Sequence, residues 1–429
     1  MDMAMMIKCL GKIQIFLVAM AIICGCRGTV PTLHVQSIRS PIAESSLVPQ
    51  ATKLRNGRIL VSWQRPLPSG GYAFEMSIGS GDEWSEMRTI ASGENLSMFS
   101  ADLPAVAQLP DGKLLAYWEL KEATEDDPYA TSIQTAISTD EGRTWGPTKT
   151  PYGKALAGQH SFISWFPNDQ GVGLLWLDAD ERAKVRLASM GTQTHADDMM
   201  GSIGLRYASL DSRGNVTSDS FIDPITCECC PTSSAITQSG PVVVYRGRQE
   251  APGTQPSKVN PYRATVRDIF ITRLQGNQWT KPHRVYADNW VINACPDNGP
   301  AVDANGKHVA VAWWTASGNQ PKVQVAFSAD SGDTFGNPIR VDARQGEGQV
   351  TVALLPGGKA AVVGWLEDGQ TWARYLRATG ETSSPIALGP APFHSRLPRW
   401  IANGDDSITA VWTRKDQKDP RVSVSRISF

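Results

Sequence analysis

An eight-residue pattern that occurs twice constrains the fold of this chain more than any other feature. Residues Ser138–Trp145 follow the spacing S-x-D-x-G-x-T-W, and Ser328–Phe335 repeat it with phenylalanine at the last position. Weaker copies keep part of the spacing, at Ser77, Gly81 and Trp84 and at Thr272, Gly276 and Trp279. The aspartate and hydroxyl side chains can accept hydrogen bonds from turn amides, and glycine permits a positive φ. Each copy is therefore expected to be a turn between strands.

These octads resemble the Asp boxes of the sialidase-like superfamily of β-propellers, whose repeats are also called BNR repeats. The resemblance covers nearly the whole chain as architecture. In that superfamily the boxes lie on outer turns, away from the active site, so it implies structural roles for Asp140 and Asp330. For activity it implies a glycan-active protein, with an exo-sialidase-like glycoside hydrolase as the enzymatic version.

The chain from Thr32 to Phe429 is expected to be a single all-β propeller. Its 14 Trp, 38 Gly and 28 Pro are typical of a large β protein. Seven pairs of alternating strands end in Trp or Tyr, several around N-G or D-G turns. They are 49–63, 104–118, 161–176, 231–245, 296–313, 350–365 and 397–412. We expect seven blades, with six as the alternative, and closure of the last blade by a strand at His34–Arg39.

The first residues are predicted to be an export signal. Lys8 and Lys12 precede an apolar run from Ile13 to Cys24, which is too short for a stable membrane span. The run ends in Cys-Gly-Cys, which resembles a bacterial lipobox with Cys26 as the lipidated residue. Residues 1–25 would then be removed, leaving a lipid-anchored protein of the bacterial cell envelope, periplasmic or at the cell surface. Plain signal-peptide cleavage is the alternative.

Charge limits the partners. The formal net charge is −1 and no long run of like charge occurs, so neither nucleic acid nor an anionic membrane surface is expected as a partner. Contact with a membrane is expected only through the lipid anchor. The predicted partner is a glycan or another small anionic ligand, and the protein is expected to be a monomer.

A propeller gathers the residues that precede its innermost strands around one mouth, whatever their separation in sequence. The unit boundaries place nine polar or thiol residues there: Asp102, Gln159, His160, Cys229, Cys230, Cys295, Gln349, His394 and Arg396. This ring is the predicted functional site.

The cysteines of T-C-E-C-C-P and of N-A-C-P are the least ordinary members of the ring. Cys227, Cys229 and Cys230 precede one unit and Cys295 the next, so disulfides are the first interpretation, with Cys229 or Cys230 paired to Cys295. The second is a copper or zinc site of these thiolates with His160 or His394. The third is a thiol with redox chemistry. No other cofactor is predicted.

The fourth unit also carries charged residues at the end of an apolar strand. They form either a salt-bridged rim or a site for an anion or sugar, with Trp290 as a stacking platform. The candidate substrate-binding arginines are Arg246, Arg248, Arg267 and Arg396. By the resemblance, Asp102 or Asp268 would be the catalytic acid, and Tyr245 with Glu250 the nucleophile pair.

One departure from the family matters for activity. The early R-I-P string of sialidases is absent from the first unit, where Lys53-Leu-Arg55-Asn-Gly forms only a turn. We therefore predict that the protein is not an ordinary sialidase. Two functions remain open: a propeller that binds or acts on glycans, and one that uses the cysteine cluster for thiol or metal chemistry.

Overall fold

The computed structural model describes residues 29–42, 45–98, 104–125, 127–153, 158–180, 203–250, 265–292, 294–391, 399–415 and 419–429. The chain divides into two compact units, Met1–Val30 and Pro31–Phe429, and almost all described residues belong to the second. The predicted leader and Cys26 lie outside the described residues and stay predictions. No helix among the described residues has the length and hydropathy needed to cross a membrane.

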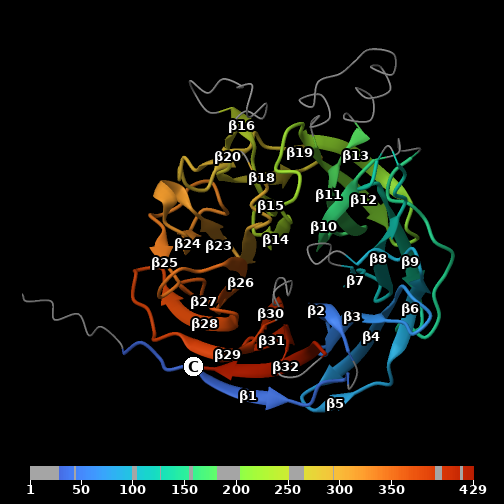
Figure 1. Ribbon diagram of the computed structural model, residues 1–429, viewed down its shortest axis with the longest axis horizontal. Coiled ribbons are helices and arrows are strands. Elements are labelled where there is room, and N and C mark those ends of the chain that lie inside the picture. The colour runs from blue at the N-terminus through green and yellow to red at the C-terminus, as the bar shows by residue number, and fades with distance from the viewer. Residues whose placement is uncertain are drawn as a thin grey trace, which may run out of the picture. The chain divides into compact units, whose positions relative to one another are not determined.

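Pro31–Phe429 forms a ring of seven antiparallel blades (Figure 1), as the strand pairs predicted. Blade 1 contains β2 (Leu47–Lys53), β3 (Ile59–Pro66), β4 (Tyr72–Ser80), β5 (Glu83–Trp84) and β6 (Arg88–Gly93). Blade 2 contains β7 (Ala105–Gln108), β8 (Leu114–Lys121) and β9 (Thr131–Ser138). Blade 3 contains β10 (His160–Pro167), β11 (Gly171–Asp178), β12 (Gly204–Asp211) and β13 (Val216–Asp223).

The remaining blades follow the same order. Blade 4 contains β14 (Ser233–Thr237), β15 (Gly240–Arg246), β18 (Ile269–Gln275), β19 (Gln278–Trp279) and β20 (His283–Arg284). Blade 5 contains β22 (Ala301–Asn305), β23 (His308–Thr315), β24 (Lys322–Ser328) and β25 (Ile339–Arg340), with a 3-10 turn at Ser317–Asn319. Blade 6 contains β26 (Gly348–Leu354), β27 (Ala360–Glu367), β28 (Gln370–Arg377) and β29 (Ile386–Pro390). A small sheet beside blade 4 joins β16 (Gln249–Glu250), β17 (Thr265–Val266) and β21 (Val291–Ile292).

Blade 7 is closed by the N-terminal strand, as predicted. It contains β30 (Arg399–Ala402), β31 (Ser407–Arg414), β32 (Arg421–Ser428) and, as its outermost strand, β1 (His34–Ile38). Strand β1 pairs antiparallel with β32, from His34 opposite Ser428 to Ile38 opposite Val424 (Figure 1). The main chain then crosses to blade 1, where Trp84 donates its indole N–H to the carbonyl of Arg39 at 2.7 Å.

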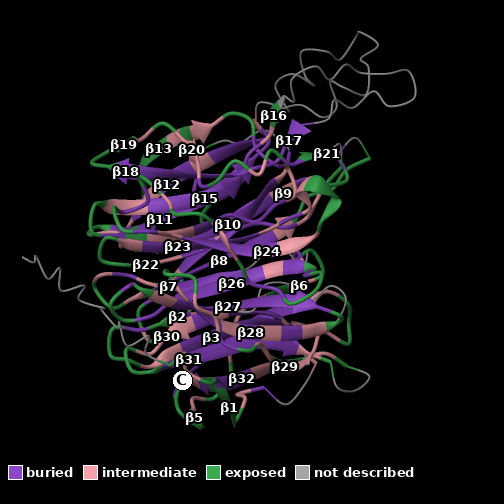
Figure 2. Ribbon diagram, turned by 90° about the vertical axis from the view of Figure 1, so that its left-hand side faces the viewer, coloured by how far each residue is buried: buried purple, intermediate pink, exposed green. Residues whose placement is uncertain are grey.

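The core lies between neighbouring blades. Buried residues run along the strands, while exposed residues gather in the turns on the two faces of the ring (Figure 2). The aromatic residue that ends the second strand of a blade is deeply buried, and Trp63, Trp176, Trp313 and Trp365 have no exposed surface. These positions fill the gap between sheets because a large flat ring spans the spacing of two packed sheets.

The two octads form the same turn. Ser138 donates its hydroxyl proton to Asp140 at 2.8 Å, and Asp140 also accepts from the amide and hydroxyl of Thr144 at 2.9 and 2.7 Å. Asp330 makes the equivalent bonds in blade 5 with Ser328 and Thr334. These bonds to Thr144 and Ser138 hold the pKa of Asp140 well below its usual range. Both aspartates therefore serve the turn, as expected for structural residues.

Candidate functional site at the mouth of blades 3 to 5

The first strands of the blades begin on one face of the ring, called here the mouth face. The opposite face carries the turns between first and second strands. Several first strands begin with a distortion, or are preceded by one: Val48, Phe162 and Gln349 within the strands, and Asp297 before β22, all have φ between 46° and 60°. In blades 1, 3 and 6 this residue lies at a register shift of the strand pair. Such strained positions persist where surrounding structure holds them, and they cluster at functional sites.

Buried or half-buried carboxylates support the walls of the mouth. Four buried tryptophans each donate the indole N–H to one of them, at 2.7 to 3.0 Å: Trp63 to Glu75, Trp176 to Asp178, Trp313 to Asp288 and Trp365 to Glu367. An indole N–H that is buried needs an acceptor, so these pairs satisfy the donor and fix the end of the second strand. They are part of the scaffold on which the site rests.

The T-C-E-C-C-P loop is held by blades 3, 4 and 5. The amide of Cys227 donates to the carbonyl of Arg246 at 2.9 Å, and that of Thr226 donates to Ile203 at 2.8 Å. A Cβ atom at Gly299 would lie only 2.1 Å from the carbonyl oxygen of Pro231, so glycine allows the two segments to meet. This close approach brings Cys295 to the loop.

All four cysteines of the loop and its neighbour form disulfides, the first interpretation of the sequence. Cys229 pairs with Cys295 across the two blades, with Cα atoms 6.3 Å apart, and Cys227 pairs with Cys230, with Cα atoms 5.6 Å apart. Both separations lie in the normal range. The sulfur atoms of Cys227, Cys229 and Cys230 also lie close enough together to hold a metal ion. Only reduced cysteines could bind copper or zinc through their thiolates, so this metal site stays a prediction.

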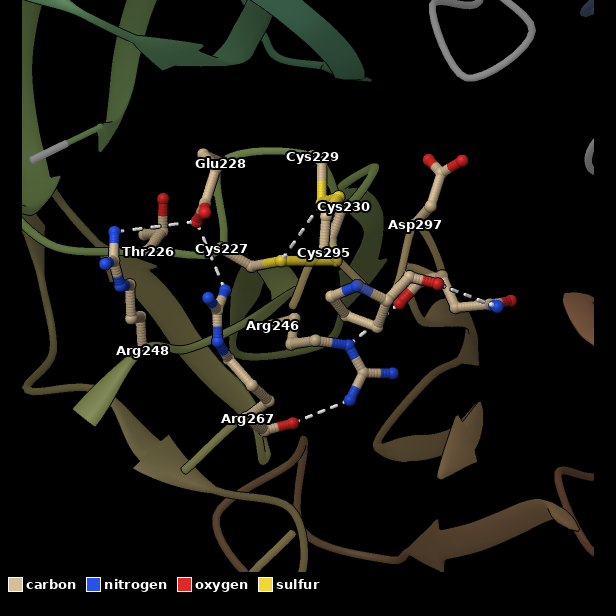
Figure 3. Close-up of a disulfide and its surroundings, with 12 residues drawn as sticks. Thr226, Cys227, Glu228, Cys229, Cys230, Arg246, Arg248, Arg267, Cys295 and Asp297 are labelled. Carbon is tan, nitrogen blue, oxygen red and sulfur yellow. Dashed lines mark hydrogen bonds and ion pairs between the residues drawn. A yellow bond between two sulfur atoms is a disulfide. The ribbon is translucent and has the colours of Figure 1, made fainter. Parts of the chain in front are cut away.

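Glu228, within the cysteine loop, is the centre of a charge cluster. Its Oε2 atom lies 3.2 Å from Nη1 of Arg267 and 3.7 Å from Nη1 of Arg248 (Figure 3). Burial alone would raise the pKa of Glu228, but the charges of Arg267 and Arg248 outweigh it and hold the pKa below its usual value. Two guanidinium groups therefore share one ionised carboxylate. Sequence reasoning missed Glu228, although it lies in the quoted string.

Arg246 has a different role from the one predicted for it. Its guanidinium donates to the carbonyls of Asn298 and Trp314 at 2.8 and 2.7 Å. It also donates to the carbonyl of Arg267 at 2.6 Å (Figure 3). The residue is 1% exposed, and burial lowers its pKa to about 9. Because its donors are used by the main chain of blades 4 and 5, Arg246 acts as a tie between blades.

The other predicted residues of blade 4 are also internal. The hydroxyl of Tyr245 donates to Asp223 at 2.6 Å, and burial is the main cause that raises the pKa of the phenol. Burial likewise raises the pKa of Asp268, whose carboxylate accepts from the amide of Trp290 at 3.2 Å. Trp290 is buried, with its ring 5.1 Å from the guanidinium carbon of Arg246, so it presents no open stacking face.

Some predicted site residues lie outside the described residues. They are Asp102, His394, Arg396 and the side chain of Glu250. Their predicted roles, and the pairing of Tyr245 with Glu250, stay predictions.

His160 belongs to a second cluster rather than to the sulfur group. Its Nδ1 atom lies 3.3 Å from Oδ2 of Asp178, and its Nε2 atom 3.8 Å from Oδ1 of Asp180. Arg206 also lies 3.3 and 2.9 Å from the two carboxylates. These groups have the donor types of a metal site, but the guanidinium already supplies the positive charge. Sequence reasoning missed the two aspartates and Arg206; the spacing W-x-D at Trp176, repeated as W-x-E at Trp365, is the signal for Asp178.

A cavity of about 550 Å³ occupies the centre of the ring and is lined by the first strands of six blades. Three charged residues line it: Lys53, Arg399 and Asp303. Arg399 donates from Nε to Gln50 at 2.7 Å, and burial lowers its pKa. Asp303 accepts from the amides of Leu354 and Ala304 at 2.7 and 2.8 Å, and burial raises its pKa to about 6. These residues face the channel rather than the mouth clusters.

Known proteins share the fold but not the sequence. No family model and no curated protein matches the chain. Among solved structures, an ulvan lyase of polysaccharide lyase family PL25, bound to a GlcA(1-4)Rha3S unit, matches with TM-score 0.54 and 8% identity over 90% of this chain and 92% of that one. A protein of unknown function from Dyadobacter fermentans matches with TM-score 0.49 and 14% identity, covering 93% and 100%. The NanB sialidase from Streptococcus pneumoniae matches with TM-score 0.42 and 12% identity, covering 92% and 69%. At these identities the likeness to the lyase shows the propeller fold alone.

Proposed function

We propose that the protein recognises anionic glycans at the mouth of blades 3 to 5, where Arg248 binds the acid group of a sugar and the buried Arg267 adds its positive charge behind it. The observation that carries the proposal is the convergence of both guanidiniums on one oxygen of Glu228. Two positive charges share one negative charge, so the cluster attracts a second anion. Arginine forks match the geometry of carboxylate and sulfate groups.

The choice of a glycan over another anion has separate support. The propeller places the arginines beside strained first strands, on the face where ligands of such folds bind. The ulvan lyase that shares the fold is bound to a sugar unit with a carboxylate and a sulfate. A uronic acid or sulfated sugar is therefore the ligand class that we propose.

The proposal concerns recognition rather than sialidase hydrolysis. Tyr245 is buried and donates to Asp223, which does not suit a nucleophile that must reach a sugar. Glu228 is held ionised by its two arginines, so it suits a charge-stabilising or basic role rather than that of a general acid.

Isothermal titration with three probes tests the proposal: a glucuronate–sulfated rhamnose oligosaccharide, sialyllactose and neutral dextran. We expect binding of at least one acidic probe and none of dextran. Arg248→Ala should weaken binding about ten- to hundredfold, because a charged hydrogen bond contributes about 1.5–3 kcal/mol. Glu228→Gln should strengthen it, because the competing carboxylate loses its charge.

Arg58→Ala is the matched control. Arg58 also pairs with a glutamate, Glu141, but it lies on the opposite face, in the turn between β2 and β3. This variant should bind as the wild type does. Equal affinity of the wild type and Arg248→Ala, or weaker binding by Glu228→Gln with its fold intact, would refute the proposed site.

A further inference from the structure

The two disulfides at the mouth differ in how far solvent reaches them. Cys295 is exposed and Cys229 half-buried, so their disulfide forms an outer bond at the surface. Cys227 and Cys230 are each only 1% exposed, so their disulfide is an inner bond. A thiol in solution can therefore reach the sulfur of Cys295, whereas the inner bond is shielded from it.

The outer and inner bonds are also in contact. The sulfur atoms of Cys227 and Cys229 lie 3.8 Å apart (Figure 3), and only Glu228 separates these cysteines in the chain. Exchange requires a thiolate to reach a disulfide sulfur. Once the outer bond is reduced, the free thiolate of Cys229 lies next to the inner bond.

We propose that the four cysteines form a two-step thiol–disulfide relay that accepts electrons from a dithiol, whether a protein or a small molecule. In the first step a thiolate of the dithiol attacks Cys295, forms a mixed disulfide, and releases Cys229 as a thiolate. The second thiol of the donor then resolves the mixed disulfide, leaving Cys295 reduced and the donor oxidised to its own disulfide. Two electrons have entered the protein.

The second step moves the disulfide inside the protein. The thiolate of Cys229 attacks Cys227, a new Cys227–Cys229 bond forms, and Cys230 leaves as a thiolate that takes a proton from water. No electrons are gained or lost in this step. A second equivalent of dithiol then reduces the new bond. The buried pair is thus reduced through Cys229 rather than by direct attack.

The charge around the loop supports such chemistry. Arg248 and Arg267 together outnumber Glu228, the residue between the two sulfurs that exchange. Nearby positive charge stabilises a thiolate over a thiol and makes it a better leaving group. Two disulfides that only stabilised the fold would not require their sulfur atoms to be in contact, nor would they require the outer sulfur to be exposed.

Cys295→Ser provides the sharpest test, because within the four-cysteine cluster it leaves one free thiol, on Cys229, beside the intact inner bond. The variant is alkylated under non-reducing conditions, and labelled peptides are located by mass spectrometry. The relay predicts label on both Cys229 and Cys230, since exchange shares the free thiol between them. Label confined to Cys229 after long incubation overturns the proposal.

A rate measurement tests the same relay in the full chain. Dithiothreitol is added at about millimolar concentration, and thiols at Cys227 and Cys230 are counted over time. In the double variant Cys229→Ser/Cys295→Ser the inner bond should be reduced at least about tenfold more slowly than in the wild type, because an adjacent thiol acts at a far higher effective concentration. Equal rates would overturn the relay, as would outer and inner bonds that both resist dithiothreitol in the folded protein.

Discussion

Asp303 is an acidic side chain on the wall of the central cavity, held by two main-chain amides, and no cation among the described residues pairs with it. It keeps some accessible surface because it lines the cavity, but protein encloses it on its other sides. Burial raises its pKa to about 6, whereas an unfolded aspartate titrates near 3.8. Between these values the folded state binds more protons than the unfolded one, so this residue makes stability fall as pH rises.

Asp303→Asn should therefore remove a pH-dependent loss of stability. We expect the melting temperature of the variant to exceed that of the wild type at pH 7 and the difference to shrink towards pH 4, an effect on the order of 1–2 kcal/mol. Asparagine keeps an oxygen that can accept from Leu354. Scanning fluorimetry from pH 4 to 7 measures the difference, and a gap that stays constant with pH would contradict the assignment.

Arg246 and Arg248 show what a sequence reveals at this scale. Both follow Tyr245 in one short string, and both were predicted to bind substrate. Strand β15 ends at Arg246, and Gly247 donates its amide to Asp268, so the alternation of the strand no longer fixes the direction of Arg248. One guanidinium enters the protein and the other reaches Glu228. The directions of the two side chains depend on contacts with neighbouring blades. The sequence of blade 4 alone therefore does not predict them.

Contacts between blades explain why the fifth residue of each octad turn is glycine. Gly332 has φ of 89°, and a Cβ atom there would lie 2.8 Å from Cδ1 of Ile271 in the preceding blade. Gly142 makes the same approach to Met76, at 2.7 Å. The box is therefore also a contact between blades, which its spacing alone did not predict.

Gly332→Ala should destabilise the protein more than Gly112→Ala does. Gly112 has nearly the same φ, 88°, but a Cβ atom there meets nothing within 4 Å. Both variants carry the cost of a positive φ, and only Gly332→Ala adds overpacking, which costs about 1–3 kcal/mol. The apparent melting temperatures of the two variants measure the difference. Equal losses would show that the contact with Ile271 yields without cost.

The blades themselves could be predicted well from sequence. Turn pairs such as Asn56–Gly57 and Asp111–Gly112 mark hairpins, and a buried aromatic residue marks the end of each second strand. These signals are local, so they survive without knowledge of neighbours. The Cys229–Cys295 bond was predicted as one of two alternatives because adjacent blades place equivalent positions together. The Cys227–Cys230 bond depends on the path of a single loop. The repeat pattern of the blades does not describe that path, so the bond was not predicted.

For the whole molecule, closure of the ring depends on β1. Removing residues 1–40 should expose the edge of β32 and the cluster that contains Ile38, Trp84 and Val424. We expect a lower melting temperature and concentration-dependent self-association, because an unpaired edge strand binds other strands. Light scattering after size-exclusion chromatography measures the association.

Removing only residues 1–30 is the control, because it leaves β1 intact. This shorter form should melt and elute as the full chain does. If the longer truncation behaves in the same way, the closing strand contributes nothing measurable to the ring.

The pairing of β1 with β32 also sets the order in which the ring can form. It joins the first described strand to the last, so it has the highest sequence separation of the described strand pairings and cannot form until β32 has been synthesised. Until then β1 stays without its partner, while local hairpins of the other blades can already assemble. Its sequence, His-Val-Gln-Ser-Ile, is short and largely solvent-facing even in the finished ring. A nascent chain can therefore carry this strand unpaired with little risk of aggregation.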